Sequence, residues 1–383
     1  MENMETQGII NIYKPVGMTS FDVVNRLRRL TSIKRIGHCG TLDPFAEGCL
    51  PICLGRATAA VRFMDGYDKS YSATLVLGAS TDSGDCTGRL TDADSRIAEK
   101  WSTWQAADGE TIRRAVANLT GEQMQVPPMY SAVKVNGRPL YKAARQGLDI
   151  PRSARKINVY AAALADYGLT SIPDLPDKIG ATELNFKAAD GPEAAEWPWL
   201  RLNLDVSKGT YVRAWAEQLA EALGTCGHLI ALERTRCGPF TSADAVRLVD
   251  LTAENWQNFL LPSETAIQTF PRLDLEYRQG EDLINGKHLP VAWLSAEQQA
   301  ILRQIRVRSK EAASLQGSGA DICGETAGGS EFVAMFYKDC FLGMGFPAEE
   351  KPQSYHRGLA ATQATIKVLC PERIFIARED YRN

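Results

Sequence analysis

The chain has 383 residues, of which 44% are hydrophobic and 8% aromatic, and its formal net charge is −3. This composition excludes a disordered chain, and the length favours one large domain plus a smaller one. The first residues lack the basic region and apolar run of a signal peptide, and no stretch approaches the length of a membrane span. We therefore expect a cytoplasmic protein that does not associate with membranes.

The nine cysteines form no C-x-x-C pair, and the four histidines are spread widely along the chain. Zinc sites in proteins take clustered cysteine and histidine ligands. We therefore expect reduced, mostly buried thiols, and neither a metal nor a cofactor.

Residues 19–30 have the pattern of an amphipathic helix. Thr19 and Asp22 can form a capping box, and the apolar residues at positions 23, 24, 27 and 30 fall on one stripe. The helix would therefore turn its arginines outward, where they add to a basic run over residues 25–35.

A glycine-rich loop follows within the segment GHCGTLDPFAEGCLPICLGRAT at 37–58. Its glycines permit backbone angles and close approaches that other residues resist, and Pro44 stiffens the chain directly after Asp43. Such a loop would hold one carboxylate rigidly beside a bulky ligand. The alternative is that Asp43 only accepts hydrogen bonds from amides of its own loop.

Residues 71–77 alternate as a strand does, and a second basic run lies further along at 134–156. This run holds seven lysines and arginines against one acid, with Tyr141 inside it and Tyr130 just before it. Basic runs with aromatic residues suit the RNA phosphate backbone, whereas a single run is often only a solvated helix face. Because this acidic chain has two such runs, we expect an RNA partner.

Residues 200–206 predict a further strand with leucines on one face, and residues 210–224 predict a helix that ends at Gly224. Arg213 would lie in the first turn of this helix, opposite much of its buried stripe. The helix dipole disfavours a cation at that end, so we expect an anionic partner for Arg213. If Asp43 is this partner, its pKa would fall, and an ionised, oriented carboxylate can act as a nucleophile or a base.

The irregular alternation of strands and helices predicts an α+β fold with a mixed, largely antiparallel sheet flanked by helices. A proline-rich acidic stretch at about 170–198 and a glycine-rich polar stretch at about 309–330 look like insertions. Short β-like segments such as FVAMFY and ATIKVL predict a small β-rich C-terminal domain. We expect domains at 1–267 and 268–383.

Several separated segments together resemble the TruB-type tRNA pseudouridine-55 synthases of bacteria. Besides the Asp43 loop, they are KPVGMTSFDVV at 14–24, KSYSATLVLG at 69–78, STDSGDCTG at 80–88, VPPMYSAVKVNGRPLYKAARQG at 126–147 and SKGTYVRAWAEQLAEALG at 207–224. They occur in the family's order. The resemblance implies a pseudouridine synthase catalytic domain followed by a small, β-rich, PUA-like RNA-binding domain.

The resemblance also implies roles for individual residues. Asp43 matches the catalytic aspartate, Arg213 matches the arginine that pairs with it, and Tyr71 matches the tyrosine that stacks on the flipped base and is a candidate for removing the proton from carbon 5. His38 matches a histidine that helps to hold the opened T-loop, and Leu232 matches an apolar contact of the active-site pocket. The remaining candidate contacts with substrate are Lys14, Lys134, Tyr141 and Arg145.

Without the resemblance, these residue types have plainer interpretations. A tyrosine in a strand is more often part of the core, a loop histidine is often a simple hydrogen-bond donor, and an arginine on a helix often forms a surface ion pair. The chain also departs from the family pattern. Cys39 stands where glycine or threonine is expected, and Ala59 stands where the family often has lysine.

The implied function is the isomerisation of uridine 55 to pseudouridine in the T-loop of tRNA, by a monomer that needs no cofactor. One alternative is a non-catalytic tRNA-binding or folding protein that uses the same basic surface. Another is an aspartate-nucleophile hydrolase, although hydrolases of glycosidic bonds usually use two carboxylates and the sequence offers no obvious partner that activates water.

Overall fold

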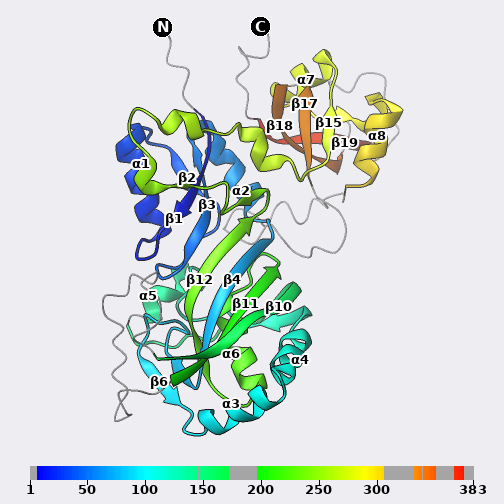
Figure 1. Ribbon diagram of the computed structural model, residues 1–383. Coiled ribbons are helices and arrows are strands. Elements are labelled where there is room, and N and C mark those ends of the chain that lie inside the picture. The colour runs from blue at the N-terminus through cyan, green and yellow to red at the C-terminus, as the bar shows by residue number, and fades with distance from the viewer. Residues whose placement is uncertain are drawn as a thin grey trace. The chain divides into compact units, whose positions relative to one another are not determined.

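The computed structural model describes residues 7–135, 137–144, 146–171, 196–305, 332–338, 340–350 and 366–374 (Figure 1). The chain forms two compact units. The large unit comprises Ile9–Gly55 and Met64–Leu261, and the small unit comprises Met1–Gly8, Arg56–Phe63 and Pro262–Asn383. Sequence patterns did not predict that Arg56–Phe63 joins the small unit, and the domain boundary between residues 267 and 268 stays a prediction.

The main sheet of the large unit has ten strands: β1 (Gly8–Lys14), β2 (Ile36–His38), β3 (Glu47–Leu54), β4 (Lys69–Leu77), β7 (Gly121–Gln125), β10 (Arg155–Ser171), β11 (Glu196–Val206), β12 (Gly227–Cys237), β13 (Phe240–Thr241) and β14 (Val246–Arg247). Eight follow the order β14-β1-β3-β12-β4-β11-β10-β7, and the central ones run side by side in Figure 1. The β1–β14 and β3–β12 pairs are parallel, whereas β12–β4, β4–β11, β11–β10 and β10–β7 are antiparallel. The expected mixed, largely antiparallel sheet is confirmed.

Helices and two short hairpins surround this sheet. The helices of the large unit are α1 (Ser20–Thr31), α3 (Ile97–Ala106), α4 (Glu110–Asn118), α5 (Leu140–Ala144) and α6 (Val212–Ala222). Helix α2 (Val61–Met64) belongs to the small unit except for its last residue. The hairpins pair β5 (Ala79–Thr81) with β6 (Leu90–Ala93), and β8 (Lys134–Val135) with β9 (Arg138–Pro139). Helix α4 packs against β10, and α6 packs against β12 and β4, so the start of α6 lies close to the centre of the sheet.

The predicted helix over 19–30 is present as α1. Its N-cap is Thr19, whose hydroxyl accepts from the Asp22 amide at 3.1 Å, while the Asp22 carboxylate accepts from the Thr19 amide at 2.9 Å. Val23 and Leu27 are buried against the core. The capping box and the buried stripe are both confirmed.

The strand predicted at 200–206 lies within β11 and faces the core as expected. Leu200, Leu202 and Leu204 are each no more than 3% exposed. Full burial of one leucine side chain contributes about 1.5–3 kcal/mol. On α6, Trp215 is buried in the same cluster, which fixes the rotation of the helix about its axis.

The small unit is built on a five-stranded sheet of β15 (Arg272–Asp274), β16 (Leu289–Pro290), β17 (Val333–Tyr337), β18 (Cys340–Glu350) and β19 (Ile366–Ile374), in the order β15-β17-β18-β19-β16. Helices α7 (Tyr277–Ile284) and α8 (Ala296–Arg303) contribute Leu283 and Leu302 to its core. The predicted segment FVAMFY contains β17, and the part of ATIKVL that the structure describes begins β19. The expected β-rich C-terminal part is confirmed.

Both predicted insertions fall largely or wholly outside the described residues. Strands β10 and β11 pair up to Ser171 and Glu196, and residues 172–195 between them are not described. The stretch 309–330 is also not described. Within the described ranges, no helix combines the length and apolar character needed to cross a membrane.

Candidate active site

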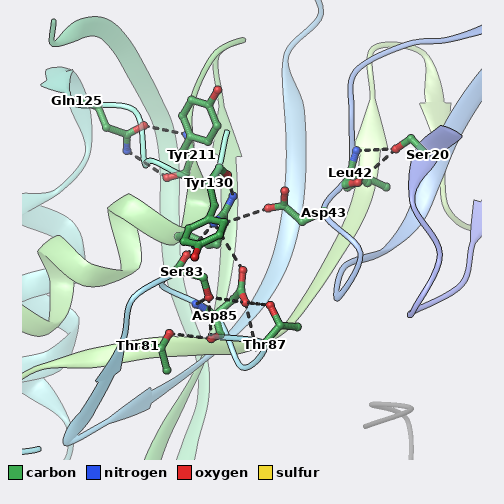
Figure 2. A network of polar contacts seen from close by, with 11 residues as sticks. Ser20, Leu42, Asp43, Thr81, Ser83, Asp85, Thr87, Gln125, Tyr130 and Tyr211 are labelled. Carbon is green, nitrogen blue, oxygen red and sulfur yellow. Dashed lines mark hydrogen bonds and ion pairs between the residues drawn. The ribbon is translucent and has the colours of Figure 1, made fainter. Parts of the chain in front are cut away.

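The loop between β2 and β3 presents Asp43 and is tied to the segment that precedes it. The hydroxyl of Ser20, the first residue of α1, accepts from the Leu42 amide at 2.9 Å and donates to the Leu42 carbonyl at 3.3 Å (Figure 2). The Pro44 carbonyl accepts from the Gly17 amide at 2.8 Å. Residues on both sides of Asp43 are therefore anchored, which restricts the position of its carboxylate.

Glycine is required at the end of this loop. Gly48 has a φ of +102°, and a Cβ atom built on it would lie 2.5 Å from the backbone oxygen of Arg234 on β12. A residue with a side chain would meet both a disfavoured backbone conformation and a clash with backbone. The close approach of β3 to β12 thus explains one glycine of the loop.

The Lys14 side chain is fully buried, at 0% exposure, and contacts the Asp43 loop. Its ammonium donates to the carbonyls of Met18 at 2.7 Å, Pro15 at 2.9 Å and Pro44 at 3.4 Å. Burial lowers the pKa of this ammonium to about 8, against the attraction of Asp43. The predicted contact of Lys14 with substrate stays a prediction; in the structure its ammonium holds the carbonyls of the loop and of the segment before it.

Arg213 lies next to Asp43, with 2.9 Å between its Nε atom and Oδ2 of the carboxylate. The expected pairing of these two residues is present. The other two nitrogens of Arg213 donate to the carbonyls of Ser83 and Tyr130, each at 2.7 Å. The arginine is only 3% exposed, because its side of α6 packs against the 82–88 loop.

Asp85 is a second carboxylate at the same guanidinium, 3.5 Å from Nη1 of Arg213. It accepts from the Ser83 hydroxyl at 2.8 Å and from the Thr87 amide and hydroxyl at 2.9 and 2.5 Å. Sequence reasoning missed this residue. The signal available was an aspartate flanked by serine and threonine within STDSGDCTG, a pattern that also fits an ordinary turn.

The pKa of Asp43 is raised above its ordinary value, mainly because its carboxyl group is buried. The Arg213 guanidinium lowers this pKa, and the negative charge of Asp85 raises it again. The expectation that pairing with Arg213 would lower the pKa is therefore wrong in its net direction. The Asp43 side chain still keeps 33% of its surface exposed, whereas Asp85 keeps 6%, so Asp43 is the carboxylate that a ligand can reach.

Tyr71 lies on β4, between Leu204 of β11 and Arg234 of β12 in the register of the sheet. The nearby Arg234 side chain favours the charged form of its hydroxyl, whereas the negative charge of Asp43 disfavours that form. Burial raises the pKa of this hydroxyl, although Arg234 opposes the shift. Leu232, two residues before Arg234, is 6% exposed and faces the same side of the sheet.

His38 ends β2 and is half-buried. Burial lowers its pKa, and the nearby charge of Arg234 lowers it further, so the imidazole is neutral at neutral pH. Its Nδ1 atom is buried without a hydrogen-bond partner among the described residues.

The remaining predicted contacts come from the segment between β7 and β10. Tyr141 lies on α5, is half-buried, and donates its backbone amide to the Ser131 carbonyl at 3.1 Å. Lys134 lies on β8. Arg145 falls outside the described residues.

Two further tyrosines border Asp43 in Figure 2 and were not singled out from the sequence as site residues. Tyr130 supplies the carbonyl that accepts from Arg213. Tyr211 directly precedes α6, and its backbone is held by Gln125, whose side chain accepts from the amide at 2.8 Å and donates to the carbonyl at 3.1 Å. Together they give the site an aromatic edge. Across the described part of the chain, no group of three His, Cys, Asp or Glu side chains could hold a metal ion.

Residues 28–175 match the model of the TruB family pseudouridylate synthase N-terminal domain, and residues 213–268 match that of the tRNA pseudouridylate synthase B C-terminal domain. The chain is 35% identical over 281 residues to tRNA pseudouridine synthase B of Clostridium tetani, covering 73% of this chain and 84% of the relative. It is 37% identical over 286 residues to the protein of the same name from Listeria innocua, covering 74% and 84%.

Among solved structures, the Cbf5-Nop10-Gar1 complex contains a chain with a TM-score of 0.59 and 21% sequence identity, covering 98% of this chain and 86% of that one. At this identity the likeness shows a shared fold alone. The sequence relatives and family models show more. The chain is a member of the TruB family of pseudouridylate synthases, which are isomerases.

Proposed function

We propose that this protein converts uridine 55 in the T-loop of tRNA to pseudouridine, with Asp43 as the catalytic residue. The observation that carries this proposal is the reachable Asp43 carboxylate, fixed 2.9 Å from the buried Arg213. The relatives named tRNA pseudouridine synthase B support tRNA as the substrate. Position 55 and the T-arm rest on the resemblance of the sequence segments.

The reaction breaks the bond between ribose and uracil nitrogen, turns the base, and forms a new bond from ribose to carbon 5. The proton on carbon 5 leaves and the released nitrogen gains one, so no co-substrate is consumed. Asp43 can add to the base, add to the ribose, or remove a proton from the sugar. All three routes need an ionised and oriented carboxylate; the Arg213 guanidinium favours the ionised form, and the anchored loop restricts its position.

A uridine in a folded RNA loop must leave its stack before it reaches the carboxylate, which costs a few kcal/mol. Stacking on an aromatic side chain returns about 1–3 kcal/mol. We assign this contact to Tyr71, with Leu232 as the apolar wall and His38 as a contact of the opened loop. The neutral Tyr71 hydroxyl that burial favours can remove the carbon 5 proton only if it first gives up its own.

Basic residues outside the site suit the remainder of the tRNA. Arg26 and Arg29 on α1, and Lys34 and Arg35 after it, are exposed. Such side chains bind phosphates without reading sequence, so selectivity would come from the shape of the folded T-arm. We propose binding as a monomer, without a metal.

A hydrolase of glycosidic bonds is less well supported. Such an enzyme needs a second carboxylate that is free to act as an acid or a base on the substrate. Asp85 is the second carboxylate here, but it is 6% exposed and bound to Arg213, Ser83 and Thr87. A single reachable carboxylate favours recombination of the two fragments over their hydrolysis.

The test is to incubate the purified protein with an unmodified tRNA transcript and to map pseudouridine at every uridine by carbodiimide labelling, with Asp43→Asn in parallel. We expect modification in the T-loop only, lost in the variant while tRNA binding persists. Binding without modification by the wild-type protein would instead establish the non-catalytic tRNA-binding protein. Release of free uracil would establish the hydrolase.

A further inference from the structure

Arg234 on β12 is a buried cation that the reaction described above does not use. Its side chain is 1% exposed, and within the part of the chain that the structure describes no carboxylate forms an ion pair with it. Burying a charge without a counter-charge is costly unless hydrogen bonds compensate. An arginine retained in such a position therefore needs an explanation from what it touches.

Arg234 touches the two ends of the Asp43 loop. Its Nε atom donates to the carbonyl of Cys49, on β3 just after the loop, at 2.7 Å. Its Nη2 atom donates to the carbonyls of Gly40 at 3.2 Å and Cys39 at 3.5 Å, just after β2. One planar guanidinium thus joins both ends of the loop across its base.

The start of the loop also fits closely around this side chain. Gly40 has a φ of +70°, and a Cβ atom there would lie 3.3 Å from Nη1 of Arg234. At the other end, Gly48 admits the backbone of Arg234 itself. The two glycines therefore accommodate the same arginine from opposite sides.

Arg234 also reaches the strand that carries Tyr71. The two residues lie directly opposite each other in the β12–β4 pair, and the nearby Arg234 side chain opposes the rise in the pKa of the Tyr71 hydroxyl. The donors of a planar guanidinium point in fixed directions, whereas those of an ammonium rotate at the end of a flexible chain. Arg234 thus donates to both ends of the loop and lies opposite Tyr71 on the neighbouring strand.

We propose that Arg234 is a positioning residue that fixes the Tyr71 hydroxyl relative to the loop that carries Asp43. It acts through these two groups and not on the RNA, because its side chain is buried. The proposal rests on the proposed function, since it assigns the alignment of the two residues on either side of the uridine. A shift of about 1 Å in such an alignment lowers a rate by about 100-fold.

The strand offers a matched control. Arg236, two residues further along β12, is 39% exposed and pairs with Asp205 at 3.4 Å and with the Ser70 hydroxyl at 2.9 Å. Arg236→Gln removes an arginine of the same strand without touching the loop or Tyr71. It should leave the rate of pseudouridine formation and the KM for tRNA unchanged.

The experiment measures the steady-state kcat and KM with the tRNA transcript for Arg234→Gln, Arg234→Lys and Arg236→Gln. Thermal unfolding of the same variants gives their stability. We expect kcat to fall by about 100-fold in Arg234→Gln, with KM within about threefold of wild type. Arg234→Lys keeps the charge but not the fork, so it should recover stability more than kcat. If Arg234→Gln does not fold, the lysine variant carries the comparison.

A double-mutant cycle with Tyr71→Phe gives the decisive readout. If Arg234 acts through the Tyr71 hydroxyl, its replacement costs clearly less in the Tyr71→Phe background than in wild type. Losses that simply add, or a raised KM with unchanged kcat, would overturn the proposal. Wild-type protein that modifies no tRNA would refute the proposed function instead, and the two failures are therefore distinguishable.

Discussion

Nε of Arg213 lies 2.9 Å from Oδ2 of Asp43, while the same guanidinium has Asp85 3.5 Å from its Nη1 atom. One positive charge thus serves two carboxylates of different accessibility. The buried one is saturated with hydrogen bonds, and the reachable one is oriented but keeps part of its surface free. This difference explains how a single arginine can hold the Asp43 carboxylate in place while part of that carboxylate stays open to a ligand.

Replacing Arg213 by lysine should lower the single-turnover rate by about 100-fold, because an ammonium cannot reach Asp43, Ser83 and Tyr130 together. The measurement is pseudouridine formation with saturating tRNA. Arg113→Lys, at an exposed position on α4, is the control and should behave as wild type. An unchanged rate in the Arg213 variant would mean that the loop alone orients Asp43.

The rate should fall on acidification at a pH above the ordinary aspartate pKa of 3.8, because the pKa of Asp43 is raised by burial. The protonated carboxyl is inactive, so activity is present above the raised pKa and is lost as the pH falls through it. A pH–rate profile with pre-bound tRNA measures the midpoint. A midpoint at or below 3.8 would contradict the raised pKa.

Lys14 should make folding stability depend on pH in the alkaline range. Its pKa is about 8 in the folded protein and 10.5 when unperturbed, so between these values the unfolded chain binds more protons and stability rises with pH. The gain is at most about 3 kcal/mol. Urea unfolding of wild type and Lys14→Met across this range gives the difference, and parallel pH dependences would refute the shift.

Gly48→Ala should be strongly destabilising, whereas Gly17→Ala should be mild. Both glycines have positive φ angles, +102° and +86°, but only Gly48 has backbone 2.5 Å from the Cβ position, and Gly17 has nothing within 4 Å. We expect a loss of more than about 2 kcal/mol for Gly48→Ala and about 1 kcal/mol for Gly17→Ala. Equal losses of stability in thermal unfolding of the two variants would show that backbone strain alone, without the clash, sets the cost of the substitution.

The sequence predicts the parts of this molecule that local rules control. The capping box at Thr19 and the buried face of β11 follow from spacing, and the Asp43–Arg213 pair was expected from a cation at a helix start together with the family resemblance. The predicted roles of the site residues stay predictions.

The sequence-based predictions that were wrong or missing concern how deeply a side chain is buried and which residues from distant parts of the chain surround it. The sequence identifies a partner for Asp43 but not how much water its carboxyl loses, so the direction of its pKa shift was wrong. Lys14 and Arg234 illustrate the same limit, because lysine and arginine are mostly exposed residues and nothing local marks these two as buried. Their positions are set by strands that pair only in the folded sheet.

The bonds from Ser20 to Leu42 and from Lys14 to Pro44 have a consequence for fragments of this protein. A chain begun after α1 would retain Asp43, Tyr71 and Arg213, yet it would lack the groups that hold the loop from outside. Such a truncated chain would contain every reacting side chain and still lack activity. The first strand and helix therefore function as a scaffold for chemistry to which they contribute no reacting atom.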